Sequence, residues 1–341
     1  MKRRLASLLL AAVLATGLTG CGAENGGADS TSSGESQDTI EVGYAVSTMA
    51  HEWYANIAKG AERRAEELGV NLTIADAAMD AGKQASYIEN FVTQGMDVIA
   101  ITPVDPTSLK APVLQAKDAG IPLLAESSAF DGMDALLGIP DYDAAYSIGE
   151  WMGQNATEDL KVLIVGQPIY EACRLRVDGF KAGLEASGVN YEIVQEVDGN
   201  GTKEDSLAVA SDALTAHPDI NVIFGINDNS ATGGMNAYKE HGLDESRLTV
   251  LGFGFEGVVG REALLSGGPY KAAVAMFPEY MGAKIVDAAV DAVNGELQEQ
   301  YMIPTVVITQ ENFDQFYTKT ADGEYETNFE AIDAMLADQA D

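Results

Sequence analysis

Residues 97–104 read DVIAITPV, and residues 221–227 read NVIFGIN. Both are short, mainly apolar runs that lack the polar–apolar alternation of a strand with one face in water. Strands buried on both faces are typical of parallel sheets that carry helices on either side. These two segments therefore predict an α/β fold built on parallel sheet.

Helical segments lie between such strands. In residues 52–68 apolar residues recur at spacings of three and four, which indicates one buried helix face; they are Trp53, Ile57, Ala61, Ala65 and Leu68. Several helical segments end in glycine just before the next strand, where a left-handed residue caps a helix at little cost; these glycines are Gly69, Gly95, Gly120 and Gly242. The alternation predicts a series of βα units.

The βα units fall into two groups. Four units occupy residues 39–127, residues 135–140 lead into a helix at 142–153, and a second series starts at Lys161. We therefore expect two similar lobes. The expected strands are residues 39–46, 71–77, 97–104, 121–126, 161–166, 191–197, 221–226, 248–253, 270–277 and 305–309.

The size and charge of the chain limit what it can do. Its 341 residues are enough for two domains of about 150 residues each. With 20 basic and 53 acidic residues the formal charge is −33, and the resulting field repels nucleic acid and anionic membrane faces. Two cysteines and three histidines leave no material for a disulfide scaffold or a zinc finger. We expect no cofactor, no metal and no nucleic acid partner.

The N-terminus has the pattern of an export signal. The basic start KRR precedes the apolar residues 5–18, which are too few for a spanning helix of about 20 residues. The sequence LTGC at residues 18–21 then resembles the lipobox of exported bacterial lipoproteins, in which the cysteine is acylated. We expect a signal peptide over residues 1–20 and a lipid anchor at Cys21; an ordinary cleavage site with a chance cysteine is the alternative.

A polar segment follows the expected anchor. Residues 22–38 read GAENGGADSTSSGESQD and contain almost no apolar side chain. Such a segment cannot bury a core and behaves as a flexible linker. We therefore expect residues 21–38 to tether a globular body to a membrane.

The body of the chain carries seven segments, in order, that together resemble a known family. They are DTIEVGYAVSTMAHEWY, QGMDVIAITPVD, AGIPLLAES, ACRLRVDGF, NVIFGINDNSATGGM, TVLGFGFEG and GELQEQYMIPTVVIT. Over residues 38–317 the chain resembles the periplasmic sugar-binding proteins of ABC importers, of the ribose- and galactose-binding type. The resemblance implies a type I periplasmic binding protein, with two Rossmann-like lobes of parallel sheet joined by a three-crossover hinge.

The resemblance also implies lobe boundaries. Residues 39–140 with 277–305 would form the N-terminal lobe, and residues 141–276 with 306–317 the C-terminal lobe. Residues 318–341 form an acidic tail, either a final helix or a loose segment. To this tail we assign no chemistry.

The function that the resemblance implies is capture and delivery, not catalysis. A sugar or sugar-like ligand, such as a polyol, an inositol or a nucleoside, would bind between the lobes and pass to an ABC permease. The protein would be a monomer, exported and lipid-anchored to the cell membrane, facing the periplasm or the cell exterior. A ligand-presenting sensor for chemotaxis or signalling is the alternative role.

A sugar site needs aromatic rings for stacking and planar groups for paired hydrogen bonds. In the first lobe the resemblance places Ser47, His51, Trp53 and Tyr54 at the ligand contacts of the loop after the first strand. The alternative is that the two rings anchor the helix in the core. Adjacent helix residues do not share one buried face, so we expect at least one ring to contact the ligand.

In the second lobe the resemblance places Arg176 and Asn227 on the ligand. A guanidinium supplies planar donors of fixed charge, which suits a hydroxylated ligand. The alternative for Arg176 is a solvated charge on a helix, as we expect for Arg174. The alternative for Asn227 is a cap on the helix that follows its strand.

Five further candidate contacts depart from the family's pattern. Glu126 and Ser127 stand where the family often has an Asp-Arg pair, and Met276 replaces a hinge glutamine. Gly254 replaces an aspartate, for which Glu256 is a candidate substitute. With these departures polyols, inositols, deoxysugars, nucleosides and furanoses all stay open as ligands.

Motifs that would indicate catalysis are incomplete. Residues 252–257 match G-x-G-x-x-G but follow a late strand, whereas the dinucleotide fingerprint belongs to the first βα turn. The pair His51-Glu52 lacks the second histidine of HExxH, and residues 198–204 lack the glycine of a calcium loop. A surface hydrolase, the enzymatic alternative, has no evident nucleophile–base pair.

Overall fold

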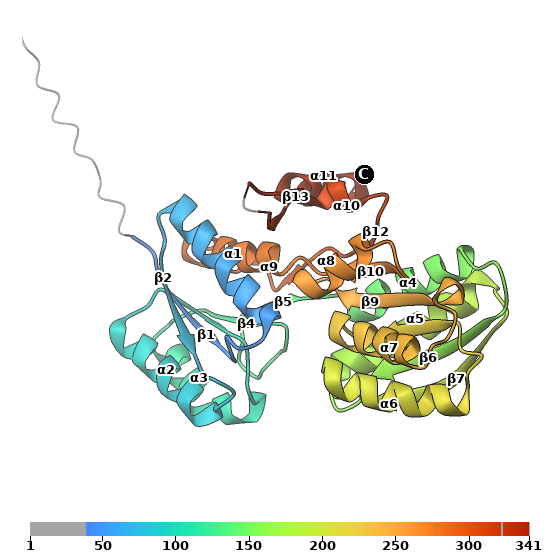
Figure 1. The fold of residues 1–341 in the computed structure, drawn as a ribbon. Coiled ribbons are helices and arrows are strands. Elements are labelled where there is room, and N and C mark those ends of the chain that lie inside the picture. Colours follow the sequence, from blue (N-terminus) through green and yellow to red (C-terminus); the bar gives the residue numbers. More distant parts are fainter. Residues whose placement is uncertain (1–38, 322, 341) are drawn as a thin grey trace, which may run out of the picture. The chain divides into compact units, whose positions relative to one another are not determined.

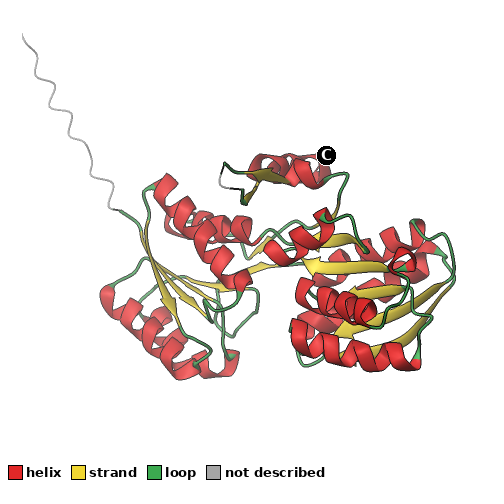
Figure 2. Ribbon diagram, in the orientation of Figure 1, coloured by secondary structure: helices red, strands yellow, loops and turns green. Residues whose placement is uncertain are grey.

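The structure, a computed structural model, describes residues 39–321 and 323–340, the last three of these by backbone alone. The predicted signal peptide (1–20), Cys21 and the tether up to residue 38 lie outside the described residues. The described chain forms two six-stranded sheets and one two-stranded sheet, and helices pack against the large sheets (Figure 1, Figure 2). The predicted α/β class, with two lobes built on largely parallel sheet, is confirmed.

The first large sheet is parallel throughout and has the order β11-β5-β4-β3-β1-β2. Its centre is buried on both faces, as the apolar run at residues 97–104 predicts: Val42 and Tyr44 pack into one core cluster, while Ala45 packs into another. The strands are β1 (Glu41–Val46), β2 (Asn71–Asp76), β3 (Val98–Ile101), β4 (Leu123–Glu126), β5 (Ala135–Gly138) and β11 (Gln300–Met302).

The second large sheet has the order β12-β10-β9-β8-β6-β7. Five of its strands are parallel, and the edge strand β12 pairs antiparallel with β10. Its strands are β6 (Leu160–Gly166), β7 (Tyr191–Asp198), β8 (Val222–Gly225), β9 (Thr249–Gly254), β10 (Tyr270–Ala275) and β12 (Val306–Thr309).

Helices cover both faces of each large sheet. Figure 1 shows α1 and α9 on one side of the first sheet and α2 and α3 on the other. The helices of the first lobe are α1 (Glu52–Leu68), α2 (Ala81–Gln94), the 3-10 turn η1 (Pro106–Leu109), α3 (Lys110–Asp118) and α9 (Pro278–Asn294). Those of the second lobe are α4 (Asp141–Gln154), α5 (Glu171–Ser187), α6 (Lys203–Ala216), α7 (Asp228–Glu240), the 3-10 turn η2 (Glu245–Arg247) and α8 (Val258–Leu265).

Helix α1 forms where its apolar periodicity predicts. Its predicted stripe is buried from Trp53 to Ala65, but Leu68 in the last turn is 42% exposed, so that part of the prediction is wrong. The helix ends directly after this residue at Gly69, whose φ of 68° lets the backbone turn away. The other three predicted glycines also have positive φ.

Helices α1 and α9 approach so closely that only glycine fits at the contact. A Cβ atom at Gly60 would overlap the carbonyl group of Glu279, and one at Gly282 would overlap the carbonyl oxygen of Ile57. The contact holds α9, which follows the last parallel strand of the second sheet, against the first sheet.

The chain passes between the two large sheets three times. These passages lie between β5 and α4, between β10 and α9, and between β11 and β12. At the second passage Phe277 adopts a left-handed φ of 49° and Pro278 begins α9. In open parallel sheets ligands bind beyond the carboxyl ends of the strands, so the loops at those ends are where a site is sought.

The acidic tail is folded over most of its length. After α10 (Phe313–Phe316) come a hairpin of β13 (Tyr317–Lys319) and β14 (Tyr325–Thr327) and then helix α11 (Phe329–Ala340). The Tyr280 hydroxyl donates to Asp333 Oδ1 at 2.6 Å, and Arg261 donates to the Tyr325 carbonyl at 3.2 Å. The final helix was one of the two predicted alternatives, and the hairpin was not predicted.

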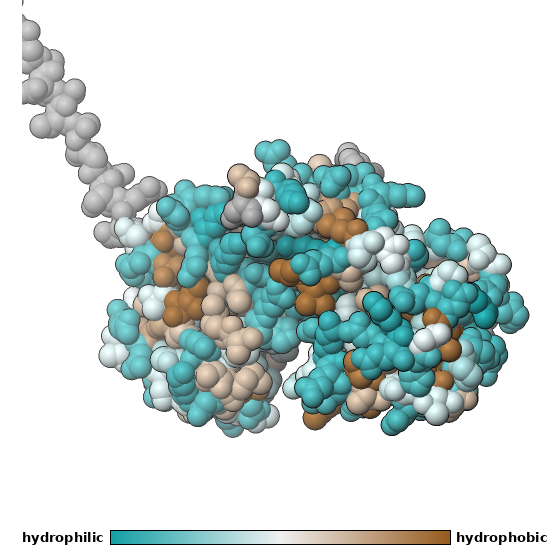
Figure 3. Space-filling view, in the orientation of Figure 1, coloured by the Kyte–Doolittle hydropathy of each residue, from teal (hydrophilic) through white to brown (hydrophobic). Residues whose placement is uncertain are grey.

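The surface agrees with the strongly acidic composition. Figure 3 shows a largely hydrophilic face over α6 and α7, with apolar residues scattered between charged ones. Among the residues that the structure describes, every helix is too short or too polar to cross a bilayer.

Candidate functional site

A buried polar network lies at the carboxyl ends of strands in the first lobe. Glu126 is fully buried at the end of β4, and the Thr102 hydroxyl after β3 donates to its Oε2 at 2.5 Å. The Ser127 hydroxyl donates to Oε1, and Tyr44 shares a hydrogen bond of 2.9 Å with Thr102. Burial raises the pKa of Glu126, while the surrounding donors oppose the shift. Both carboxyl oxygens therefore have partners before any ligand arrives.

Ser127 and Ser47 show how the loops of this lobe are held. Ser127 has a φ of 61°, a left-handed conformation that non-glycine residues seldom adopt, and this turn brings its hydroxyl back onto Glu126. Ser47, directly after β1, is 2% exposed, and its buried hydroxyl has the Tyr54 phenol as its polar neighbour. A hydroxyl both donates and accepts, so Ser47 can also serve a ligand.

The aromatic residues of the first loop separate as expected. His51 caps α1 by accepting the Trp53 backbone N–H at Nδ1, 3.2 Å away. Trp53 is only 7% exposed and packs in the main core cluster. Tyr54 is half-buried, and its ring meets the His51 ring edge-on at 5.9 Å.

Tyr54 lies within the field of two carboxylates. Burial first, and then the negative charges of Glu126 and Glu256, raise the pKa of Tyr54 to about 12. Because Glu126 follows a strand of the first sheet and Glu256 one of the second, the phenol lies near acidic groups of both lobes. Tyr54 is thus better placed than the buried Trp53 to offer a ring or a hydroxyl to a ligand.

Arg176, on α5 of the second lobe, is held by several partners. Its Nε donates to Asp141 Oδ1 at 2.7 Å, and Nη1 donates to the Ile226 carbonyl at 3.0 Å. Its guanidinium carbon lies 4.4 Å from the Phe253 ring centre, and Nη2 is 3.6 Å from the sulfur of Met276. Arg176 is therefore not a solvated helix charge. Its charge has a carboxylate partner, and its Nη2 side is the one least satisfied by protein.

The side-chain amide of Asn227 is hydrogen-bonded within the second lobe. It is the N-cap of α7: its Oδ1 accepts the Ser230 backbone N–H at 2.7 Å, and its Nδ2 donates to the Gly201 carbonyl at 3.0 Å. The structure thus shows the helix cap that sequence offered as the alternative. One N–H of the amide is left for another acceptor.

Glu256 is a buried acid of the second lobe with an unpaired oxygen. It follows β9 and is 8% exposed, and its Oε2 has no hydrogen-bond partner. Burial raises its pKa to about 7, although the Arg176 charge acts in the opposite direction. Asp228 beside it also has a pKa raised to about 7 by burial. The Asp228 carboxylate accepts the Tyr270 hydroxyl at 2.5 Å and the Glu256 backbone N–H at 3.3 Å.

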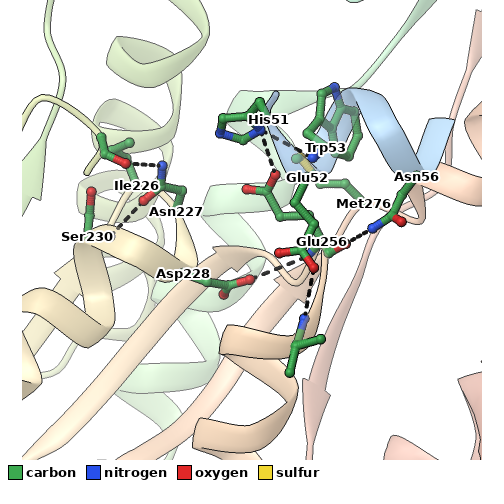
Figure 4. A network of polar contacts seen from close by, with 12 residues as sticks. His51, Glu52, Trp53, Asn56, Ile226, Asn227, Asp228, Ser230, Glu256 and Met276 are labelled. Atoms are coloured by element: carbon green, nitrogen blue, oxygen red, sulfur yellow. Dashed lines mark hydrogen bonds and ion pairs between the residues drawn. The ribbon is translucent and has the colours of Figure 1, made fainter. Parts of the chain in front are cut away.

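The loop of Glu256 meets the first turn of α1, as Figure 4 shows. His51 Nδ1 lies 3.6 Å from Glu256 Oε2. The Asn56 amide donates to the Glu256 carbonyl at 2.6 Å, and the Val258 backbone N–H donates to Glu52 Oε1 at 3.2 Å. Residues of both lobes therefore converge at this loop.

Gly254 and Met276 lie on neighbouring strand ends of the second lobe. Gly254 has a φ of 100°, and its carbonyl accepts the Met276 backbone N–H at 3.0 Å. Met276 is 3% exposed and places its thioether against Arg176. Through these contacts the structure connects Gly254, Met276, Arg176, Glu256 and His51 in one neighbourhood.

Sequence analysis missed the partners on which the site depends. Asp141, Thr102 and Asp228 were not proposed as site residues. Asp228 had a usable signal, since it follows Asn227 at the carboxyl end of a buried strand. Asp141 had none, because nothing in the chain relates it to Arg176 before the fold brings α4 against α5.

Two cavities of the described chain lie beside this neighbourhood, and the predicted residues line neither. One, of about 450 Å³, lies between α5 and the ends of β6 and β7, with Gln167, Cys173 and Lys181 in its wall. The other, of about 200 Å³, lies between α1, α8 and the tail hairpin. Within the described range no three His, Cys, Asp or Glu side chains are placed to hold a metal ion.

The chain forms two lobes of largely parallel sheet and passes between them three times. Polar side chains of both lobes lie at strand ends that converge. Together these features define a two-lobed solute-binding protein. The chain belongs to the periplasmic binding protein domain family, whose model matches residues 42–297. The resemblance to this family inferred from the seven segments is confirmed.

Curated relatives span nearly the same length. The ribose import binding protein RbsB of Salmonella typhimurium is 27% identical over 279 residues, which cover 81% of this chain and 92% of that protein. The protein of the same name from Bacillus subtilis is 28% identical over 297 residues, covering 86% and 95%. A Mycobacterium smegmatis protein solved in complex with β-D-fucofuranose is 26% identical, with a TM-score of 0.70, and the match covers 80% of this chain and 92% of that one.

Proposed function

We propose that this protein captures a sugar or a sugar-like ligand between its two lobes and delivers it to the permease of an ABC importer. It acts by binding and release, not by catalysis. The relatives named for ribose import and the relative solved with a furanose support this class of ligand. The observation that carries the proposal is the convergence of His51 and Tyr54 of the first lobe with Glu256 of the second.

The lobes of this proposal follow the sheets. Residues 39–140 with 277–305 would form one lobe and residues 141–276 with 306–317 the other, with the three crossings as the hinge; the grouping of the strands into two large sheets supports this division. Ligand favours closure to the extent that it binds the closed arrangement more tightly than the open one. Groups contributed by both lobes provide that difference.

The first lobe would contact the ligand through the Tyr54 ring, the Ser47 hydroxyl, the His51 imidazole and the network of Glu126 and Ser127. Trp53 supports this loop from the core. Tyr54 supplies a ring face for the apolar side of a sugar, and the hydroxyls and the carboxylate supply its polar partners.

The second lobe would contact the ligand through the free side of Arg176, the remaining N–H of Asn227 and the open oxygen of Glu256. Gly254 gives the chain room to approach, and Met276 closes one side of the pocket with an apolar surface. The ligand meets polar groups from two directions, which fixes its orientation.

The cellular location of the protein is part of the proposal. Export by residues 1–20 and acylation at Cys21 would hold a monomeric body beside the membrane on a tether, facing the periplasm or the cell exterior. Metabolic labelling with a palmitate analogue should mark the wild-type chain and not Cys21→Ala. Labelling of both forms, or of neither, would contradict lipidation at this residue.

The ligand itself is tested by release and titration. Protein purified under native conditions is denatured, and the released small molecules are identified by mass spectrometry. A panel of sugars, polyols and nucleosides is then titrated while tryptophan fluorescence and melting temperature are followed. At least one hydroxylated compound should raise the melting temperature by several degrees, as binding to the native state requires. A panel without any response would overturn the proposal.

A further inference from the structure

The charges of the candidate site do not balance. Glu126 and Glu256 are buried carboxyl groups, 0% and 8% exposed. The cation of the site is Arg176, and it is paired with Asp141 at 2.7 Å, so its charge is largely offset before it reaches Glu256. Taken together, the groups that face a ligand have an excess of negative charge.

Glu256 is where the imbalance is greatest. The groups that face it are His51, Glu52 and Tyr54 from α1, Arg176 from α5 and Asp228 from α7. Glu52, Tyr54 and Asp228 carry no positive charge in either protonation state, and Arg176 is shared with Asp141. Glu256 Oε2 nevertheless has no hydrogen donor, although its residue is more than nine-tenths buried.

His51 does not supply the missing charge. Its Nδ1 lies 3.6 Å from Glu256 Oε2, but burial lowers the pKa of His51, so the imidazole is neutral at and above pH 7. The same nitrogen accepts the Trp53 backbone N–H and therefore has no proton to donate in that state. His51 approaches the carboxylate without neutralising it.

A buried carboxylate with an open oxygen is costly unless a cation or a donor meets it. The hydroxyl of Ser47, buried directly after the first strand of the other lobe beside the Tyr54 phenol, is a second polar group that can meet a ligand. A charged N–H donor gives shorter and stronger hydrogen bonds to a carboxylate than a neutral hydroxyl does. An ammonium group carries three such donors.

We propose that the solute of this protein is an amino sugar or an amino polyol, whose protonated amine binds Glu256 while its hydroxyls bind the remaining groups of the site. This inference rests on the proposed function and narrows its ligand class. The formal charge of −33 acts in the same direction, because it attracts cationic solutes and repels sugar phosphates and sugar acids.

The test compares matched pairs that differ in one group. Glucosamine is titrated against glucose, galactosamine against galactose, and an inosamine against myo-inositol, by calorimetry at pH 7.5 and low salt. The N-acetylated amines, which keep the ring but lose the charge, extend each pair. The tightest-binding compound should be a free amine that binds at least ten-fold more tightly than its neutral match.

The variant Glu256→Gln assigns the preference to this carboxylate. Glutamine keeps the shape and removes the charge, so the advantage of the amine over its neutral match should fall at least ten-fold, beyond any loss of affinity that the two ligands share. The control is Glu62→Gln, an exposed carboxylate on the outer side of α1, which should leave both affinities unchanged.

Proton release tests the same pairing in the unaltered chain, so it does not depend on the folding of a variant. An ammonium beside Glu256 favours its ionised form, so with an amine that is already fully protonated at pH 7 a group with a pKa of about 7 would release up to about half a proton on binding. Calorimetry in two buffers of different ionisation enthalpy measures this number. Binding without proton release would count against the pairing.

The outcomes separate the inference from the proposed function. A neutral sugar or polyol that binds as tightly as its amine, or more tightly, overturns the inference and leaves the proposed function standing. An amine preference that survives in Glu256→Gln also overturns it. If no compound of any pair shifts the melting temperature, the proposed function fails, and this inference fails with it.

Discussion

The two lobes offer polar groups of different kinds at their converging strand ends. In the first lobe Glu126 holds the hydroxyls of Thr102 and Ser127, so the carboxylate is satisfied from within. In the second lobe the Nε and Nη1 of Arg176 have protein acceptors, whereas Glu256 Oε2 has no donor. The difference teaches that a polar residue at a ligand position is not necessarily free for a ligand. The unsatisfied group is the one that indicates the ligand's chemistry.

The largest loss of stability and of ligand affinity is expected when the Arg176–Asp141 pair of the second lobe is broken. Arg176→Ala leaves Asp141 nearly buried without its cation and removes the donor of the Ile226 carbonyl. Losing one partner of a buried pair is strongly destabilising, so unfolding in urea should show a loss of about 3 kcal/mol. Ligand affinity should fall at least a hundred-fold.

A double-mutant cycle separates the two roles of Arg176. Arg176→Ala with Asp141→Ala removes both charges, and should recover a large part of the lost stability without recovering ligand binding. If stability stays as low as in the single variant, the Asp141 pair is not what the guanidinium contributes. If ligand binding returns, Arg176 does not contact the ligand.

Breaking the Glu126 network of the first lobe should lower stability less than Arg176→Ala does. Glu126→Ala leaves the hydroxyls of Thr102 and Ser127 buried without their acceptor and opens a small cavity, at a cost of about 2 kcal/mol. Glu126→Gln keeps an acceptor oxygen and should cost less than half of that. Thermal and urea unfolding of both variants measure the difference. Equal losses would show that neither the filled volume nor the retained acceptor oxygen stabilises the lobe, and that the second carboxyl oxygen or its charge does.

The acids of the second lobe predict an unusual pH dependence. The pKa of Asp228 is raised from 3.8 to about 7, so the folded state holds a proton that the unfolded state releases above pH 4. Stability from this group is therefore full at low pH and is lost as pH rises towards 7 and beyond. We expect Asp228→Asn, which mimics the protonated form, to be more stable than wild type at pH 8, on the order of 2 kcal/mol.

The same variant provides its own control at lower pH. At pH 5 the native Asp228 is protonated but the unfolded carboxyl is ionised, so the advantage of Asp228→Asn should be smaller than at pH 8 and should disappear only below about pH 4, where both states are protonated. Because the chain carries many other carboxylates, the measured quantity is the difference between the two proteins at each pH. A difference that stays constant from pH 5 to pH 8 would show that Asp228 titrates normally.

Sequence alone is enough to locate the parallel strands and most helix ends, because local rules determine them. The run at residues 97–104 predicts a doubly buried strand, and β3 is buried along its length. Gly69 marks its helix end correctly. The hairpin of β13 and β14 was missed, since strands of three residues give no periodicity to read.

The site was less predictable than the fold. The family resemblance assigned residues by position, but it could not show which of their donors and acceptors the fold already uses. Arg176 meets Asp141 across 35 residues of sequence, and Asn227 meets Gly201 across 26. Such partners are settled by the packing of helices on a sheet, and no pattern in the chain records them.

The smallest predicted loss of stability concerns Asn227. It tests whether a residue with protein partners in the second lobe also contacts the ligand. Asn227→Ala removes the N-cap of α7 and should lower stability by about 1 kcal/mol. Asn227→Asp keeps the acceptor for the Ser230 N–H but sets an oxygen against the Gly201 carbonyl in place of the amide donor, so the loss of that hydrogen bond should lower its stability as well. If the amide serves only the fold, Asn227→Asp binds the best ligand of the panel with unchanged affinity. If Asn227→Asp stays folded and loses affinity, the second N–H of Asn227 reaches the ligand. The second lobe would then contact the ligand through Asn227 as well as through Glu256.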